Sequence, residues 1–199
     1  MKELVVATRN KKKLIEIQRL IQDLGVKPRS LDCFKGLPEE IEEDGDSFEA
    51  NASKKALEIS KRIDNLVIAD DSGLEVFALN NEPGIHSARY AGLEQNDEKN
   101  IEKLLKVMAP YKGDERAAQF RCVICVSKGE EVIDIVEGVV RGHITERCSG
   151  NTGFGYDPVF IPVGYDKTFA QLGDDIKDNI SHRAMALNKA KEVIRKYFE

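Results

Sequence analysis

Two short, uninterrupted apolar runs constrain the fold of this chain more than any other feature. They cover residues 4–7 (Leu-Val-Val-Ala) and residues 66–69 (Leu-Val-Ile-Ala). Such runs are typical of strands that are buried on both faces, as in the parallel sheets of α/β proteins. Polar residues follow each run, and open α/β sheets bind ligands beyond the carboxyl ends of their strands. The sequence therefore predicts an α/β fold with a ligand site after these two strands.

The turn after the first run, Thr8-Arg9-Asn10, leads into a predicted helix over residues 14–24. A strand, turn and helix in this order present free amide hydrogens and the positive end of the helix, which suits phosphate. The first turn also carries Lys11, Lys12 and Lys13. A lysine cluster is usually a solvated helix face. Cations at a helix N-terminus are unfavourable unless an anion lies close, so a phosphate site is the alternative that this position favours.

Acidic residues gather in residues 39–46 and at Asp70-Asp71. The first segment contains six carboxylates in eight residues, and such a run is by itself best explained as a solvated loop. Asp70 and Asp71 directly follow the second apolar run, where we expect the strand to end. A turn-forming aspartate explains one of these carboxylates better than both. Because adjacent carboxylates repel and gain from a bound cation such as Mg²⁺, we favour a metal site here.

Residues 150–158 (Gly-Asn-Thr-Gly-Phe-Gly-Tyr-Asp-Pro) are too interrupted for a helix or a strand. Glycine permits positive φ and a close approach of the backbone to a ligand. Phe154 and Tyr156 offer ring faces, and Asp157 offers a charged acceptor. These groups can hold a flat heterocycle. Taken by itself, the segment is explained equally well as a tight turn whose aromatic side chains pack into the protein.

The remaining elements are predicted from periodicity and capping residues. A helix is expected after Asp46, which forms an apparent capping box with Glu49, and another around residues 101–108. Strands are expected at residues 74–79, 117–127, 131–137, 139–145 and 159–161. Consecutive strands without intervening helices pair antiparallel, so the sheet is predicted to be mixed.

The last predicted helix begins near Ser181, a good N-cap residue, with His182 and Arg183 in its first turn. Cations are unfavourable there unless an acidic or anionic partner is near. His182 is therefore a candidate ligand contact, and a surface histidine at a helix terminus is the alternative.

Composition excludes several classes of protein. A chain of 199 residues fits one domain, or at most two small lobes. With a net charge of −5, the chain lacks the overall positive potential that attracts a nucleic-acid polymer. No apolar run approaches the roughly 20 residues that span a membrane. We expect a cytoplasmic protein. Cys122 and Cys125 have zinc-knuckle spacing but lie three apart in a predicted strand, so they should face opposite sides of the sheet.

Six motifs in order make the chain resemble the inosine/xanthosine triphosphate pyrophosphatase family, which removes purine nucleotides with non-standard bases from the nucleotide pool. The motifs are Thr8-x-Asn10-x-x-Lys13, Ser47-Phe48-Glu49-x-Asn51-Ala52, Ala69-Asp70-Asp71-Ser72-Gly73-Leu74, Pro83-Gly84-x-x-Ser87-Ala88-Arg89-Tyr90, Gly153-Phe154-Gly155-Tyr156-Asp157-Pro158 and Ile180-Ser181-His182-Arg183. They span nearly the whole chain. The sequence departs from the family where Arg9 and Asn151 replace common glycines.

The resemblance implies an α/β fold of two lobes around a long mixed sheet flanked by helices, with a central nucleotide-binding cleft. It implies one domain over residues 1–199, Mg²⁺ as cofactor and a homodimer. Asp71 would be the catalytic carboxylate and a metal ligand, and Glu42, chosen only from its distance to Gly45, would be its partner ligand. The implied substrate-binding residues are Thr8, Arg9, Asn10, Lys11, Lys12, Lys13, Lys55, Ser72, Phe154, Gly155, Tyr156, Asp157, Lys177, His182 and Arg183.

The resemblance leads us to expect Mg²⁺-assisted hydrolysis of ITP, dITP or XTP to the monophosphate and pyrophosphate. Lysines would stabilise the leaving pyrophosphate, and Asp71 would orient or deprotonate the attacking water. Donors such as those of His182 or Arg183 would select a 6-keto base. The alternatives are a pyrophosphatase for other modified nucleotides and a nucleotide-binding regulator that does not hydrolyse its ligand.

Overall fold

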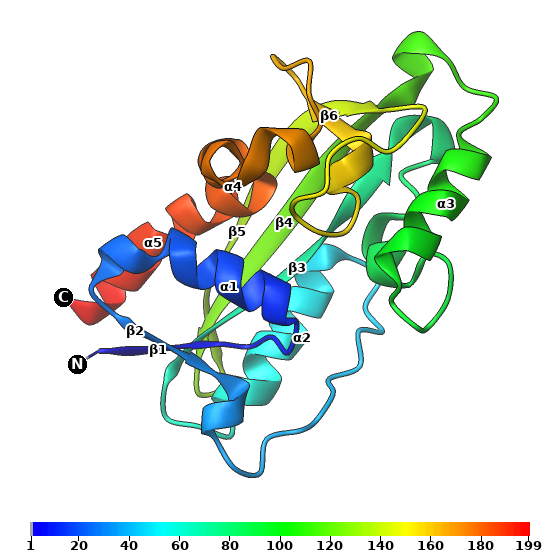
Figure 1. Cartoon of the computed structure of the whole chain (residues 1–199). Coiled ribbons are helices and arrows are strands. Elements are labelled where there is room, and N and C mark those ends of the chain that lie inside the picture. Colours follow the sequence, from blue (N-terminus) through cyan, green and yellow to red (C-terminus); the bar gives the residue numbers. More distant parts are fainter. Residues whose placement is uncertain (1) are drawn as a thin grey trace. The chain divides into compact units, whose positions relative to one another are not determined.

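The computed structural model describes residues 2–199 and has a mixed α/β architecture, as predicted (Figure 1). Its six-stranded sheet has the order β2-β1-β3-β4-β5-β6. Strand β1 (Glu3–Val6) pairs in parallel with β2 (Lys27–Ser30) and with β3 (Leu66–Val76). Strand β5 (Glu131–Ile144) pairs antiparallel with β6 (Phe160–Pro162). The remaining strand is β4 (Ala117–Lys128).

Five α-helices accompany these strands in the described part of the chain. They are α1 (Lys11–Leu20), α2 (Phe48–Ser60), α3 (Asp97–Val107), α4 (Phe169–Ile180) and α5 (His182–Phe198). Short 3-10 helices lie at Gln22–Leu24, Leu31–Cys33, Phe77–Leu79, Gly84–Arg89, Gly113–Arg116 and Asp157–Val159. Among residues 2–199, no helix is both long and apolar enough to cross a membrane.

The chain divides into two compact units. Unit 1 contains Met1–Asp71, Cys122–Gly138 and Arg183–Glu199, and unit 2 contains Ser72–Arg121 and Val139–His182. The boundaries fall inside β3, β4 and β5, so each of these strands contributes residues to both units.

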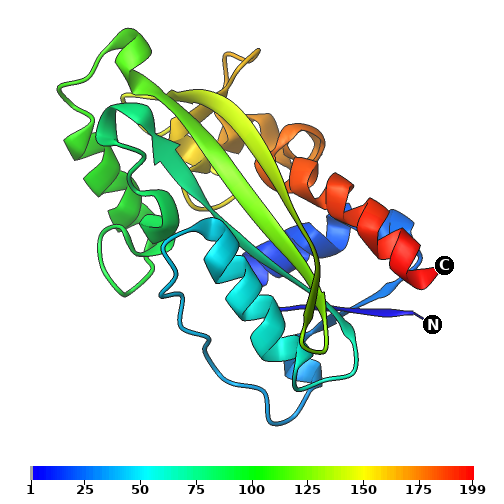
Figure 2. The same cartoon turned by 180° about the vertical axis from the view of Figure 1, so that it is seen from behind.

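In unit 1, α1 and α5 cover one face of the sheet and α2 covers the other, as the two opposite views show (Figures 1 and 2). Alternate strand residues such as Leu4, Ile68 and Ile124 pack with Ile17 of α1 and Leu187 of α5. This alternation explains the uninterrupted apolar runs, because a strand covered on both faces buries every side chain.

The same alternation separates the two cysteines of β4, as predicted. Cys122 belongs to the core beneath α1 and α5, and Cys125 interacts with Ser53 of α2. Burial raises the pKa of the Cys122 thiol to about 12 and that of Cys125 to about 11. Burial and a raised pKa are typical of unreactive core thiols.

Unit 2 has its own core, built from aromatic and aliphatic residues of β3, β4 and α3 and of the segments around β6. Phe120, Phe160 and Phe169 form its aromatic centre, with ring centroids of Phe120 and Phe160 4.6 Å apart. Leu104 and Met108 contribute the apolar side of α3 and are fully buried.

Three predictions of local structure were wrong, and one helix was not predicted. β3 does not end at Asp70 but continues to Val76, and it includes the first residues of the strand predicted at 74–79. The strand can continue because cations contact both buried aspartates. The strands expected on either side of Gly138 form one strand, β5, because pairing within the sheet keeps this glycine extended and no turn forms there. Ser47, not Asp46, is the N-cap of α2. Helix α4 was missed, although Thr168 and Gln171 form a capping box at its start.

Candidate functional site

The turn between β1 and α1 is held by its own side chains. Thr8 Oγ1 accepts a hydrogen bond from the Asn10 amide at 3.1 Å, and Asn10 Oδ1 accepts from the amides of Lys12 at 3.0 Å and Lys13 at 3.1 Å. Asn10 is therefore the N-cap of α1. This cap fixes the direction in which the first turn of α1 presents its lysines.

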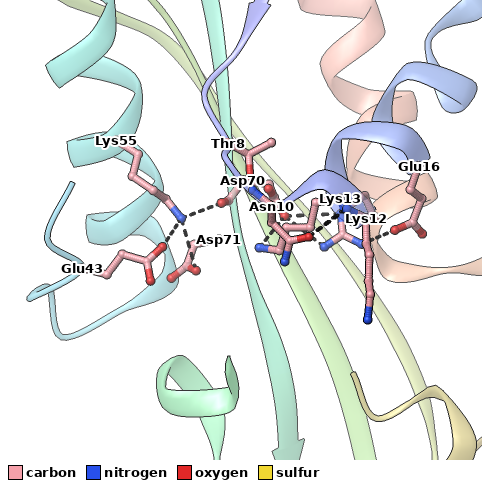
Figure 3. Close-up of polar contacts among 10 residues, drawn as sticks. Thr8, Asn10, Lys12, Lys13, Glu16, Glu43, Lys55, Asp70 and Asp71 are labelled. Carbon is pink, nitrogen blue, oxygen red and sulfur yellow. Dashed lines mark hydrogen bonds and ion pairs between the residues drawn. The ribbon is translucent and has the colours of Figure 1, made fainter. Parts of the chain in front are cut away.

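Of the three lysines, Lys13 is the one that turns toward the sheet. Its Nζ lies 3.1 Å from Asp70 Oδ2 in β3 (Figure 3). Lys11 and Lys12 are exposed on the first turn of the helix. Arg9, one of the two departures from the family that the chain resembles, donates to Asp32 Oδ1 at 3.0 Å and to the Pro38 carbonyl, so it leaves the Asn10 cap intact.

Asp70 belongs to a buried network of charges that also includes Arg183 and Glu16. The Arg183 guanidinium donates to Asp70 Oδ2 at 3.0 Å and to Glu16 Oε2 at 2.5 Å. The side chains of Arg183 and Asp70 are 2% and 1% exposed. The first turn of α5 thus has the acidic partners that a cation at this position requires. Sequence reasoning missed Glu16, which lies beside Ile17 on the buried side of α1.

Lys55 of α2 points to the other aspartate, Asp71. Its Nζ lies 2.5 Å from Glu43 Oε1, 2.7 Å from the Asp70 carbonyl oxygen and 3.5 Å from Asp71 Oδ1 (Figure 3). Burial opposes the charge of Lys55, but the carboxylates of Asp71 and Glu43 outweigh it and raise the lysine pKa. One ammonium group therefore brings two carboxylates from different segments to the same place.

The acidic segment before α2 is anchored rather than freely solvated. The Gly45 amide donates to Asn51 Oδ1 at 2.9 Å, and Lys54 Nζ lies 2.5 Å from Asp44. A side chain at Gly45 would collide with Asn51, since a Cβ would lie 2.7 Å from its Oδ1. These contacts place Glu43 beside Lys55, whereas Glu42 is exposed.

The two adjacent aspartates have opposite acid–base properties. Burial tends to raise the pKa of Asp70, but Lys13, Arg183 and Lys55 together lower it far below its ordinary value. Burial raises the pKa of Asp71, and Lys55 and Lys13 only partly oppose this effect. Paired carboxylates with divergent pKa values are typical of acid–base sites, in which one group stays ionised and the other exchanges a proton.

In unit 2, the glycine-rich loop is organised around the Asp157 carboxylate. Asp157 Oδ2 accepts from the Phe154 amide at 2.8 Å and from Lys177 Nζ at 2.7 Å. The Lys177 ammonium also lies 4.5 Å from the centroid of the Phe154 ring, a cation–π contact. Gly153 must lack a side chain, since a Cβ would lie 2.2 Å from Asp157 Oδ2.

The next residues of this loop contact two segments that are distant in sequence. The Gly155 amide donates to Asp97 Oδ2 at 3.1 Å, and Tyr156 Oη donates to the Ser87 carbonyl at 2.9 Å. Asp97 was not among the predicted site residues. Its position in the first turn of α3 is typical of helix-capping acids, and no sequence spacing relates it to Gly155.

The adjacent residues His182 and Arg183 belong to different units and contact different residues. His182 is buried in unit 2, with its ring stacked on Phe120 at 4.7 Å between centroids. A surface histidine is therefore excluded. Arg183 belongs to unit 1 and to the Asp70 network. Ser72 follows Asp71 in β3 and is half-buried in unit 2.

The carboxylates of this site could bind a metal ion only together with ligands from outside the protein. Within residues 2–199, no three or more histidine, cysteine, aspartate or glutamate side chains are grouped closely enough to hold a metal ion. Glu43 and Asp71, however, converge on one cation, Lys55. Mg²⁺ commonly takes one or two carboxylates and completes its shell with water and substrate phosphates. The pair is therefore compatible with Mg²⁺ that arrives together with a polyphosphate.

Comparison with known proteins gives consistent results. The model of the Ham1 family matches residues 4–193. The dITP/XTP pyrophosphatase of Bacillus subtilis is 45% identical over 98% of both chains, and that of Clostridium perfringens is 47% identical over 98% of both. Among solved structures, the Ham1 protein of Staphylococcus aureus has a TM-score of 0.86 at 42% identity, covering 98% of this chain and 100% of the other. A HAM1 protein from Coxiella burnetii has a TM-score of 0.88 at 38% identity, with the same coverage.

Proposed function

This chain belongs to the Ham1 family, and we propose that it hydrolyses purine nucleoside triphosphates with non-standard bases, such as dITP and XTP, to the monophosphate and pyrophosphate. Relatives that are 45% and 47% identical over nearly their whole length are dITP/XTP pyrophosphatases. The observation that carries the proposal is the position of Lys55, whose ammonium lies 2.5 Å from Glu43 Oε1 and 3.5 Å from Asp71 Oδ1. Burial raises the pKa of this Asp71 carboxyl group. This arrangement combines a phosphate-binding cation, a metal-binding pair and a base.

We propose that unit 1 binds the triphosphate. Lys13 and Lys55 are the cations that neutralise the phosphate oxygens and the leaving pyrophosphate, and the capped turn at Thr8 and Asn10 contacts the same group. Asp71 accepts a proton from the attacking water, a role to which its raised pKa is suited. Asp70 stays ionised and holds Lys13 and Arg183 in place.

We propose Mg²⁺ as the cofactor, held by Asp71 and Glu43. We prefer Glu43 to Glu42 because the carboxylates of Glu43 and Asp71 both contact the Lys55 ammonium. When bound, the metal would neutralise the polyphosphate and polarise the bond to be broken. Lys55 would keep the two carboxylates close together before the substrate arrives.

We propose that unit 2 binds the purine base. The Phe154 ring offers a stacking face, and Lys177 and the buried His182 are donors that can recognise a 6-keto oxygen. A 6-amino base would leave such donors unpaired, at a cost of about 1–3 kcal/mol, or about tenfold to a hundredfold in rate. The role of Arg183 as a base contact stays a prediction, since its guanidinium here donates to Asp70 and Glu16.

The test is a panel of nucleoside triphosphates scored for pyrophosphate release with Mg²⁺. We expect dITP, ITP and XTP to be cleaved about tenfold to a hundredfold faster than ATP, and chelation of the metal to abolish release. Equal rates for ITP and ATP would contradict the selectivity. Tight binding of dITP without release of pyrophosphate would instead identify a nucleotide-binding regulator.

The organisation of the protein expected from the resemblance is also proposed. We propose a cytoplasmic homodimer in which residues 1–199 of each chain form one domain. Light scattering should then give twice the chain mass of 22.3 kDa. Because β3, β4 and β5 contribute to both units, circular dichroism and fluorescence should report one coincident unfolding transition.

A further inference from the structure

We propose that Asp97 is a positioning residue for base recognition, which it supports by fixing the backbone of the Phe154–Tyr156 loop. This inference rests on the function proposed above. Asp97 Oδ2 accepts the Gly155 amide hydrogen at 3.1 Å. The neighbouring Phe154 amide donates to Asp157 Oδ2 at 2.8 Å. Consecutive amides of the loop are thus held by carboxylates from two different elements.

The loop needs such restraints because its backbone is intrinsically free. Gly153 and Gly155 have φ values of +75° and +59°, a region in which glycine is favoured. Glycine also loses more conformational freedom on ordering than other residues do, so a loop with two glycines is costly to order. A carboxylate acceptor on the Gly155 amide selects one conformation of Phe154, whose ring we propose as the stacking face for the base.

Helix α3 is a suitable support for Asp97 because it is itself fixed to the rest of unit 2. Asn100 is buried, accepts from the Ala91 amide at 2.7 Å and donates to the Ala88 carbonyl at 2.9 Å. At the other end, Arg116 donates to the carbonyls of Met108 and Tyr111, just beyond the last turn of α3. Asp97 therefore projects from an element whose position is determined along its length.

Helix α3 also holds the segment that follows Ser87, the hydrogen-bond partner of Tyr156. Asn100 holds residues 88–91, and the preceding Ser87 accepts the Tyr156 hydroxyl through its carbonyl at 2.9 Å. The loop is thus connected to α3 directly through Asp97 and indirectly through Ser87. Of these two connections, the Asp97 contact is the one to the loop amide next to Phe154, so its loss should alter the position of the ring while the core remains packed.

The experiment compares Asp97→Ala with Glu98→Ala. Both residues are acidic and lie in the first turn of α3, so both substitutions change the interaction with the helix dipole equally. Glu98 is exposed and is the matched control. We expect Asp97→Ala to raise KM for dITP about tenfold, the usual effect of losing a hydrogen bond to a charged group. We expect kcat to change less than about twofold, since Asp71 and Lys55 are unaffected, and Glu98→Ala to match the wild type.

Two further measurements separate positioning from a general loss of structure. Inorganic triphosphate has no base, so its inhibition constant should be the same in Asp97→Ala and wild type. Asp97→Asn keeps an acceptor oxygen, so its KM should lie nearer the wild-type value than that of Asp97→Ala. An inhibition constant that rises in parallel with KM, or no difference between the two Asp97 variants, would overturn the inference.

The outcome also distinguishes this inference from the proposed function. If the wild-type protein releases no pyrophosphate from dITP, the function itself is wrong. If the wild type is active and Asp97→Ala has the same KM as Glu98→Ala, only the role of Asp97 is wrong. Thermal unfolding of each variant establishes that the proteins compared are folded.

Discussion

Asp70 and Asp71 are adjacent in β3, yet their carboxylates contact different cations. Asp70 Oδ2 lies 3.1 Å from Lys13 Nζ and 3.0 Å from the Arg183 guanidinium, whereas Asp71 Oδ1 lies 3.5 Å from Lys55 Nζ. Successive side chains of a strand point to opposite faces, so one aspartate meets α1 and α5 and the other meets α2. Their surroundings lower the pKa of Asp70 and raise that of Asp71.

The first prediction is that asparagine substitutions of the two aspartates have different consequences. Asp71→Asn should lower kcat about 10²–10⁴-fold, the usual contribution of a general base. It should cost less stability than Asp70→Asn, because burial disfavours the Asp71 charge and Lys55 keeps Glu43 as a partner. Asp70→Asn should destabilise the fold by about 3–5 kcal/mol, because it leaves Arg183 and Lys13 without a buried carboxylate. Pyrophosphate release and urea unfolding measure both effects. An Asp71→Asn enzyme with full activity would refute the catalytic role.

The second prediction concerns the pH dependence of stability in metal-free protein. Folding lowers the pKa of Asp70 from its ordinary value of 3.8, because the charges of Lys13, Arg183 and Lys55 outweigh the effect of burial. The unfolded chain therefore takes up a proton near pH 3.8 while the folded protein stays ionised, so Asp70 stabilises the fold above this pH. This contribution is lost as the pH falls through the folded-state pKa. Unfolding free energies of wild type and Asp70→Asn should differ most at neutral pH and converge below pH 3.8; a constant difference would contradict this assignment.

The third prediction identifies the metal-binding glutamate. Glu43 contacts Lys55 at 2.5 Å beside Asp71, whereas Glu42 is exposed. Glu43→Gln should raise the Mg²⁺ concentration needed for half-maximal activity about tenfold or more, because a neutral amide is a poorer Mg²⁺ ligand than a carboxylate. Glu42→Gln is the matched control and should behave as wild type. The reverse order of effects in a magnesium titration would assign the role to Glu42.

The fourth prediction concerns the buried pair Lys177 and Asp157, which are 4% and 2% exposed. Lys177→Met removes the cation from the Asp157 carboxylate and should cost about 3–5 kcal/mol of unfolding free energy. The double variant Lys177→Met with Asp157→Asn should lose less stability than the two single variants together, because neither position then carries a buried charge. Denaturant unfolding of the four proteins of this cycle provides the measurement, and strict additivity would show that the two groups do not interact.

The fifth prediction compares two glycines of the same loop. Both have positive φ, so an alanine at either position carries a backbone cost of about 1 kcal/mol. A Cβ at Gly153 would lie 2.2 Å from Asp157 Oδ2, whereas at Gly155 it would meet nothing within 4 Å. Gly153→Ala should therefore lower stability and raise KM for dITP clearly more than Gly155→Ala does. Equal effects would mean that the backbone conformation alone matters at these positions.

Local sequence patterns account for much of the fold. The runs at residues 4–7 and 66–69 predicted strands that are buried on both faces, and apolar periodicity predicted α1, α2 and α3. The glycine-rich segment predicted a loop, and Asn10 was correctly placed at the end of the turn that caps α1. These features depend on residues close in sequence, whose backbone preferences act within one turn or one strand.

The errors arise where a local preference competes with burial. Asp70 and Asp71 are poor strand residues, and β3 nevertheless continues through them because lysines and an arginine compensate their charges. Gly138 was taken as a break between strands, but the hydrogen-bonded ladder keeps it extended. In each case, contacts distant in sequence outweigh the preference of the residue itself.

The sequence by itself determined which kinds of group this protein carries and in which order: a capped turn with lysines, paired aspartates, an aromatic glycine loop and a final helix that begins with His182 and Arg183. Only the tertiary structure decided how these groups are paired. Arg183 meets Asp70, 113 residues away, and Gly155 meets Asp97, 58 residues away. The physical reason is that a carboxylate's pKa and partners depend on the charges and the burial around it in space, and the packing of helices onto the sheet determines both.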